Sequence, residues 1–171
     1  MKQQIIVSGL GGQGAVTLSR LLAEAALAMS LPVITSETHG MAQRGGTVIS
    51  MVKVGEFRGP LIPAGSADVG LFLQEKNLPA HRHYIKPEGS MVVNGATSGD
   101  YLHLDALELA IGLGLPPVAG NLILLGFAAG KRLLFCRDDL LEEIIREKSP
   151  ERFREENLKA LREGINRAAR E

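Results

Sequence analysis

Short apolar runs alternate along this chain with longer segments in which apolar residues recur at helical spacing. The apolar runs predict strands at residues 5–7, 32–35, 48–54, 69–73, 91–94 and 101–104. The longer segments predict helices at residues 15–29, 76–83, 105–112, 121–135, 137–148 and 150–170. Such alternation is typical of α/β proteins. We therefore expect one Rossmann-like, doubly wound α/β domain over residues 1–171, with a mostly parallel sheet and helices on both faces.

Three segments refine this expectation. Residues 48–54 are apolar on both faces apart from Ser50 and Lys53, which is typical of a central strand. Residues 86–89, Lys-Pro-Glu-Gly, predict a turn before the strand at 91–94. The mostly apolar run 121–135 predicts a buried helix, in which Gly126 and Gly130 permit close helix packing.

A glycine-rich turn links the first predicted strand to the first helix. We call residues 9–14 the glycine turn; within it, Gly9, Gly11 and Gly14 have the G-x-G-x-x-G spacing of dinucleotide-binding turns. Glycines allow a tight bend and a close approach by a ligand or a neighbouring chain, and the free amides at the helix start can hold an anion. The turn also departs from the usual pattern, because Gly12 and Gln13 add a fourth glycine and a bulky amide. We expect the whole turn to face a ligand or a partner.

The polar segment 36–46, between two predicted strands, is the second candidate site. It contains an acid, an imidazole, an amide and a guanidinium, namely Glu37, His39, Gln43 and Arg44. By the strand prediction these residues lie beyond a carboxyl end of the sheet, where open α/β sheets place their sites. The alternative is a structural loop in which Arg44 pairs with Glu37 or with backbone carbonyls. No nucleophile–base pair is evident, so no catalytic residue is predicted.

Composition narrows the function classes. Lysine plus arginine and aspartate plus glutamate each number 19, so the formal net charge is zero, which disfavours nucleic-acid binding and favours association. We expect a cytoplasmic protein without membrane contact, because the start of the chain has no signal-peptide pattern and no apolar run approaches a bilayer span. The single cysteine, Cys136, is expected to be buried, and one thiol cannot hold an iron–sulfur cluster.

The histidines predict no metal site. His81 and His83 can project to one side of an extended segment, but zinc sites need further ligands at set spacing. A solvated surface explains this pair better than a metal does. His103, between two leucines, is expected at the rim of a strand.

Several segments resemble the beta subunit of indolepyruvate:ferredoxin oxidoreductase, and through it the gamma subunit or gamma domain of the 2-oxoacid:ferredoxin oxidoreductases. The resemblance is carried by the glycine turn, by residues 38–46 (Thr-His-Gly-Met-Ala-Gln-Arg-Gly-Gly), and by residues 60–63, 121–126 and 157–164. It spans nearly the whole chain, and the segment His-Gly-Met-Ala-Gln-Arg-Gly-Gly favours the indolepyruvate branch. One departure is the connection between the strand at 91–94 and the helix near 105, which is usually longer in the family.

The resemblance implies an oxidative decarboxylation of aryl 2-oxoacids with coenzyme A, which yields an acyl-CoA, carbon dioxide and reduced ferredoxin. It places thiamine diphosphate, Mg and 4Fe-4S clusters in a larger partner subunit and no cofactor in this chain. We therefore expect an accessory subunit of a hetero-oligomer, with the glycine turn and residues 37–44 facing the partner and the mouth of the active site. Arg44 would hold a carboxylate or phosphate by two parallel hydrogen bonds.

Two other interpretations remain open. A stand-alone NAD(P)-binding oxidoreductase or sensor would use the glycine turn for the pyrophosphate and Glu37 for a ribose hydroxyl. A purely structural scaffold would assemble without any effect of the turn on catalysis.

Overall fold

The computed structural model describes residues 1–38 and 46–171, and within them six strands form one sheet in the order β2-β3-β1-β4-β5-β6. The strands are β1 (Gln3–Leu10), β2 (Val33–Glu37), β3 (Thr47–Val54), β4 (Ala67–Phe72), β5 (Ile85–Asn94) and β6 (Leu102–Leu104). The pairs β1–β4, β4–β5 and β5–β6 are parallel, whereas β3 is antiparallel to both of its neighbours, β1 and β2. The predicted α/β domain and mostly parallel sheet are confirmed, but the sheet is mixed.

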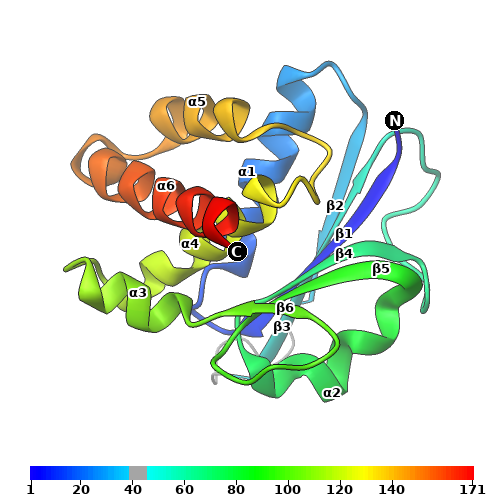
Figure 1. The fold of residues 1–171 in the computed structure, drawn as a ribbon. Coiled ribbons are helices and arrows are strands. Elements are labelled where there is room, and N and C mark those ends of the chain that lie inside the picture. The colour runs from blue at the N-terminus through cyan, green and yellow to red at the C-terminus, as the bar shows by residue number, and fades with distance from the viewer. Residues whose placement is uncertain (39–45) are drawn as a thin grey trace.

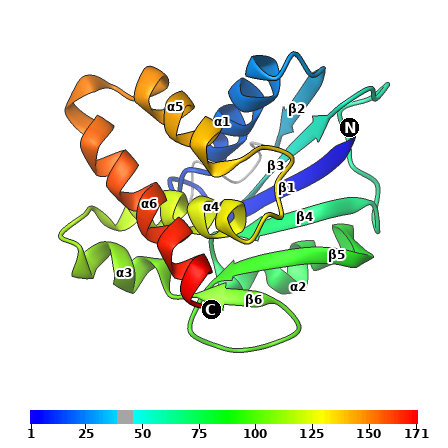
Figure 2. The same cartoon turned by 45° about the horizontal axis from the view of Figure 1, so that its top comes forward.

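The helices are distributed unequally between the two faces of the sheet. They are α1 (Ala15–Ala28), α2 (Leu78–His81), α3 (Ala106–Gly112), α4 (Gly120–Gly130), α5 (Asp138–Lys148) and α6 (Arg154–Arg170). Figures 1 and 2 show α1 and α3 to α6 on one face, while α2, only four residues long, lies on the other. Helices on both faces were expected, but the second face carries only this short helix among the described residues. One cause is β3, because an antiparallel strand can be reached without a crossover helix.

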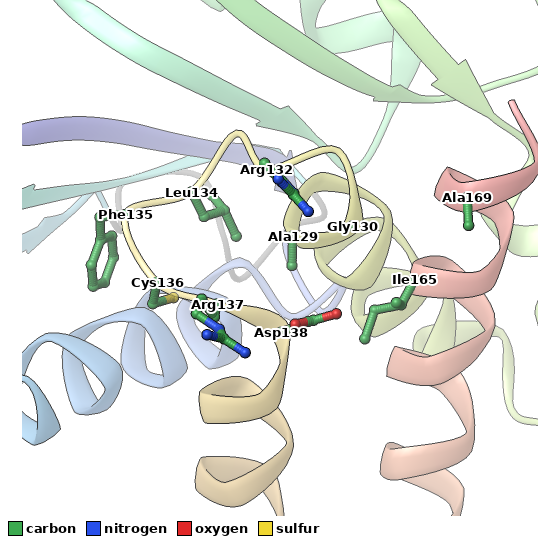
Figure 3. Close-up of a pocket in the computed structure, with 10 residues that line it drawn as sticks. All are labelled: Ala129, Gly130, Arg132, Leu134, Phe135, Cys136, Arg137, Asp138, Ile165 and Ala169. Carbon is green, nitrogen blue, oxygen red and sulfur yellow. The ribbon is translucent and has the colours of Figure 1, made fainter.

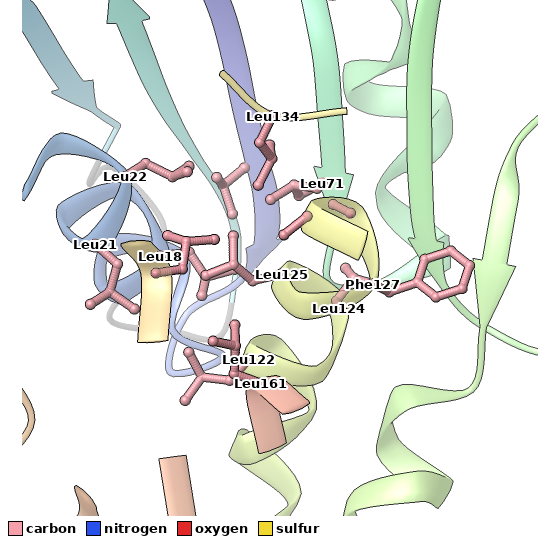
Figure 4. Close-up of a cluster of buried hydrophobic side chains, with 14 of the residues drawn as sticks. Leu18, Leu21, Leu22, Leu71, Leu122, Leu124, Leu125, Phe127, Leu134 and Leu161 are labelled. Carbon is pink, nitrogen blue, oxygen red and sulfur yellow. The ribbon is translucent and has the colours of Figure 1, made fainter. Parts of the chain in front are cut away.

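Alternate strand residues face opposite sides of the sheet and divide the core in two. In β1, Ile5 and Val7 contribute to the large core under the helices, whereas Ile6 contributes to a smaller cluster on the other side. Figure 4 shows leucines of α1 and α4 together with Leu71 of β4 in the large core. The smaller cluster gathers around Phe72 and Ile62 and includes Leu78 of α2. Because β3 is buried from Val48 to Val54, the predicted central strand is confirmed.

Helix α4 is buried along nearly its whole length, between the sheet and α6. Two glycines bring α4 and α6 together: a Cβ at Gly126 would overlap the carbonyl oxygen of Leu161, and one at Gly164 would overlap that of Ile123. The predicted helix at 121–135 is too long, because α4 ends at Gly130 and Arg132 takes a left-handed conformation (φ 57°). The apolar residues that follow, including Leu134 and Cys136, are buried outside any helix.

The turn predicted at residues 86–89 is wrong, because these residues belong to β5. The register between β4 and β5 shifts there: Ala67 pairs with Ile85, but Val69 pairs with Ser90. The extra residues are accommodated as an irregularity in β5, with Gly89 close to the carbonyl oxygen of Ala67. Pairing with β4 therefore outweighs the preference of Pro87 and Gly89 for a turn.

Candidate functional site

The glycine turn lies at the carboxyl end of β1 and leads directly into α1 (Figure 1). Gly12 and Gly14 have φ values of 86° and 91°, the left-handed region that favours glycine. Gln13 closes the turn on itself: its N–H donates to the Leu10 carbonyl (3.1 Å), and its Oε1 accepts from the Leu10 N–H (2.7 Å). The bulky amide that departs from the dinucleotide-binding pattern is therefore a structural part of the turn.

Side chains from distant segments hold the outside of the turn. Asn121 at the start of α4 donates from Nδ2 to the Gln13 carbonyl (3.1 Å), and Gln13 Nε2 donates to Gln74 Oε1 (2.9 Å). Asn121 fills the position that a Cβ on Gly14 would occupy, so a glycine at this position allows the start of α4 to pack against the turn. Asn77 donates from Nδ2 to the Gly9 carbonyl (2.7 Å).

Sequence analysis did not identify Asn77, Gln74 or Asn121 as parts of this site. Asn77 and Asn121 are 68 and 108 residues from the turn residues that they contact. Each of these residues is a single amide side chain, and none of them belongs to a sequence motif with a characteristic spacing. The one available signal is that Asn121 precedes a run of apolar residues that is buried throughout.

A polar cluster lies beneath the turn on the side of the sheet that carries α2. The side chain of Ser8, fully buried, contacts His81 Nδ1 at 2.6 Å, and Ser8 Oγ accepts a hydrogen bond from Asn77 Nδ2 (3.1 Å). Burial of the ring lowers the pKa of His81 below its usual value, and the neighbouring His83 lowers it further. The serine is inaccessible as a nucleophile, so this cluster supports the strand end and does not form a catalytic pair.

Glu37 is placed less favourably for a nucleotide than the strand pattern suggested. It is the last residue of β2, as expected, but it pairs with Ser50 of β3, which in turn pairs with Val7 of β1. The whole width of β3 therefore separates Glu37 from β1, roughly 10 Å at ordinary strand spacing. His39, Gln43 and Arg44 lie outside the described residues. The interpretation of residues 36–46 as an active-site loop stays a prediction.

Two hollows, of about 330 and 350 Å³, adjoin the glycine turn, and a third, of about 220 Å³, lies beside them. The first is bounded by amides of Gln13, Gln74, Asn94 and Asn121, and the second by Leu10 and the first turn of α1. Val118 lines all three hollows. The turn thus opens onto a neutral surface, with amides on one side and apolar side chains on the other.

A further hollow, of about 580 Å³, is lined by residues from the C-terminal ends of α4 and α6, from the start of α5 and from the connection between α4 and α5 (Figure 3). Its charged residues are Arg132, Arg137 and Asp138, and Arg137 already pairs with Asp139 at 3.0 Å. Charges of both signs and an exposed ion pair give this hollow no clear preference for a ligand.

No cofactor-binding set is recognisable in the part of the chain that the structure describes. Residues 1–38 and 46–171 contain no group of three or more His, Cys, Asp or Glu that could hold a metal ion. Cys136 is buried, which raises the pKa of its thiol to about 12, and a single protonated thiol does not fit an iron–sulfur cluster. His81 is bonded to Ser8, while the ring of His83 lies 4.3 Å from that of Tyr84. None of the described helices has the length and apolarity needed to cross a membrane.

Comparison with known proteins identifies the family. The profile of the family described as Pyruvate ferredoxin/flavodoxin oxidoreductase matches residues 4–167. The chain belongs to this family. Its relatives include the indolepyruvate oxidoreductase subunit IorB of Archaeoglobus fulgidus, which is 34% identical over 194 residues that cover 98% of this chain and 96% of the relative. The corresponding subunit of Methanothermobacter thermautotrophicus is 29% identical, with 99% of each chain covered.

Solved structures of oxoacid:ferredoxin oxidoreductases share the fold. The gamma subunit of a keto/oxoacid ferredoxin oxidoreductase from Geobacter sulfurreducens matches with a TM-score of 0.81 at 23% identity, over 99% of each chain. A 2-oxoglutarate:ferredoxin oxidoreductase from Magnetococcus marinus, solved with 2-oxoglutarate, coenzyme A and succinyl-CoA bound, matches with a TM-score of 0.81 at 20% identity. The match covers 99% of this chain but 31% of the Magnetococcus chain.

Membership of the pyruvate ferredoxin/flavodoxin oxidoreductase family confirms the resemblance found in the sequence. The match to the Archaeoglobus subunit spans 194 positions, more than the 171 residues of this chain, so that relative contains residues without a counterpart here. That the missing residues belong between Asn94 and Asp105 stays a prediction. Three observations disfavour the stand-alone dinucleotide-binding interpretation. The chain belongs to the oxidoreductase family, β3 separates Glu37 from β1, and Asn121 occupies the space beside Gly14.

Proposed function

We propose that this chain, over residues 1–171 as one gamma-type domain, is the accessory subunit of an indolepyruvate:ferredoxin oxidoreductase. The main support for this proposal is that this chain and the indolepyruvate oxidoreductase subunits match each other over almost their whole lengths. The reaction is the oxidative decarboxylation of an aryl 2-oxoacid with coenzyme A, coupled to reduction of ferredoxin. We also propose that the complex acts in the cytoplasm.

We assign thiamine diphosphate with its Mg, and the 4Fe-4S clusters, to the larger subunit. The single buried thiol of this chain supports the assignment of the clusters, because one protonated thiol does not fit a cluster. The present chain contributes surface and positioning. Its match to 31% of the longer Magnetococcus chain supports this, because there the same fold is joined to further polypeptide.

We propose that the glycine turn and residues 37–44 form the surface that faces the larger subunit and the mouth of the active site. The residues that we assign to it are Gly9, Gly11, Gly12, Gln13, Gly14, Glu37, His39, Gln43 and Arg44. The anchoring of Gln13 by Asn121 and Gln74 supports the role of the turn, because a partner is held best by a surface that is already rigid. Arg44 is proposed to hold a carboxylate or phosphate at the mouth of the active site.

Replacement of Arg44 tests this assignment. Loss of a two-pronged charge-assisted hydrogen bond costs about 1.5–3 kcal/mol, so Arg44→Ala should weaken assembly, or raise the KM for the 2-oxoacid or coenzyme A, by about tenfold to a hundredfold. The melting temperature of the isolated chain should not change. Titration of the two subunits and steady-state kinetics of the complex give the readouts.

The control for this experiment is Arg20→Ala, which removes an exposed arginine from α1. This variant should assemble and turn over like the wild type. If Arg44→Ala also retains both the affinity and the kinetic constants, Arg44 has no role at the site.

A further inference from the structure

A neutral, partly apolar surface continues from the glycine turn across the start of α4 to the start of α6. We call it the Val118 face and define it by Gly12, Thr17, Leu107, Val118, Asn121 and Phe153, which line its hollows. Figure 1 shows that the turn, α3 and the start of α4 lie at the same end of the molecule.

Large apolar side chains are exposed on the Val118 face. Val118 itself is 51% exposed, Leu107 is 44% exposed and Phe153 is 41% exposed. Ile111, one turn beyond Leu107 on α3 and therefore on the same side of that helix, is 53% exposed. Single exposed apolar residues are common, but a group of them around neighbouring hollows is typical of an interaction site.

Charge is scarce on this face. Among the described residues that line the three hollows, Glu156 is the only charged one, although 22% of the chain is Asp, Glu, Lys or Arg. Depletion of charge distinguishes the core of a protein–protein interface from ordinary protein surface. Among the residues that the structure describes, no lysine or arginine lines these hollows, which disfavours a phosphate-bearing ligand.

The family argues for an unlike partner, because the relatives that match over nearly the whole chain are subunits of indolepyruvate oxidoreductases. Close packing against the hollows requires a partner with apolar side chains that protrude into them. The amide groups of Gln74 and Asn121 at the margin can hydrogen-bond neutral backbone groups of that partner.

We propose that the Val118 face is the main docking surface for the larger subunit, and that the larger subunit contributes a neutral segment with protruding apolar side chains. This inference rests on the proposed function and specifies its interface. The contact brings the glycine turn against the partner as part of one continuous surface. Val118, which borders all three hollows, is its central residue.

Two aspartate substitutions test the interface in the two-subunit complex. Val118→Asp and Leu107→Asp should each weaken binding of the larger subunit by about a hundredfold, because docking would bury a charge without a partner. Leu107 lies in the first turn of α3, where a negative charge is favourable, so that variant should fold normally. Binding is measured by titration of the subunits, and folding by the melting temperature of the free chain.

Leu27→Asp is the matched control, since Leu27 is 59% exposed and lies at the end of α1 opposite the glycine turn. It should bind like the wild type. Wild-type affinity in both Val118→Asp and Leu107→Asp refutes this inference while the accessory-subunit function stands. If the subunit affinity is unchanged but the KM for substrate rises, the Val118 face binds a small ligand. If the affinity is unchanged but self-association is lost, the face binds a second copy of the chain. Either result also refutes this inference. If the wild-type chain itself does not bind the larger subunit, both proposals fail.

Discussion

At the scale of single residues, the glycine turn shows one motif serving two purposes. The left-handed backbone falls on Gly12, which is outside the G-x-G-x-x-G spacing, and on Gly14, which also accommodates Asn121. Gly12 has the same kind of backbone with open space around it. The spacing alone could not reveal this difference, because it depends on a side chain 108 residues from Gln13.

The Ser8–His81 contact predicts a pH dependence of stability. Ser8 Oγ accepts from Asn77, so its own proton is available to a neutral His81 ring at Nδ1. The pKa of His81 is lowered in the folded protein, mainly by burial, whereas the unfolded chain binds the proton near the usual value of 6.5. The neutral ring therefore stabilises the fold above that value, and its contribution is lost as the pH falls below it.

The variant His81→Gln should accordingly show a shallower loss of unfolding free energy between about pH 7.5 and about pH 5.5, measured by denaturant titration. Ser8→Ala is the control: it removes the hydroxyl but leaves the ring buried, so most of the pH dependence should remain. Equal slopes in wild type and His81→Gln would show that His81 does not carry this dependence.

At the scale of elements, the closest packing is between α4 and α6, and it depends on glycine. Gly126→Ala gains helix propensity of up to about 1 kcal/mol but places a Cβ against the carbonyl of Leu161. Overpacking against rigid backbone costs about 1–3 kcal/mol, so we expect net destabilisation, measured as a lower denaturation midpoint with an unchanged m-value.

The matched substitution is Gly112→Ala on α3, where a Cβ would meet nothing within 4 Å. This variant should be as stable as the wild type or slightly more stable, because only the propensity gain applies. If both variants were stabilised, α4 and α6 would not be held at the distance that the structure shows.

The existence and type of most elements could be predicted from sequence, but their pairing could not. Residues 48–54 read correctly as a central strand, yet nothing in them indicates that β3 runs antiparallel between β2 and β1. Residues 133–136 are as apolar as the helix before them, so periodicity did not reveal that α4 ends at Gly130. There the Gln3 side chain bonds to Leu133 O and Phe135 N, each at 2.8 Å, a contact with no local sequence signal.

At the scale of the whole molecule, the proposed interaction surface lies around the carboxyl end of β1. The glycine turn and the Val118 face adjoin there, whereas the mixed-charge hollow of Figure 3 lies near the other end of α4. A chain of zero net charge with one neutral, concave face is suited to a lasting contact with another subunit. Under the proposed function, the chain positions groups around a site that is built largely by its partner.

The most direct measurement is purification of the tagged chain from native, oxygen-free extract, followed by analysis of iron and thiamine diphosphate in what co-purifies. We expect a larger subunit that brings both, and a complex that reduces ferredoxin when supplied with indolepyruvate and coenzyme A. A chain that purifies alone, without iron or thiamine diphosphate, and whose melting temperature rises with NAD or NADP, would contradict the account and support a stand-alone nucleotide-binding protein.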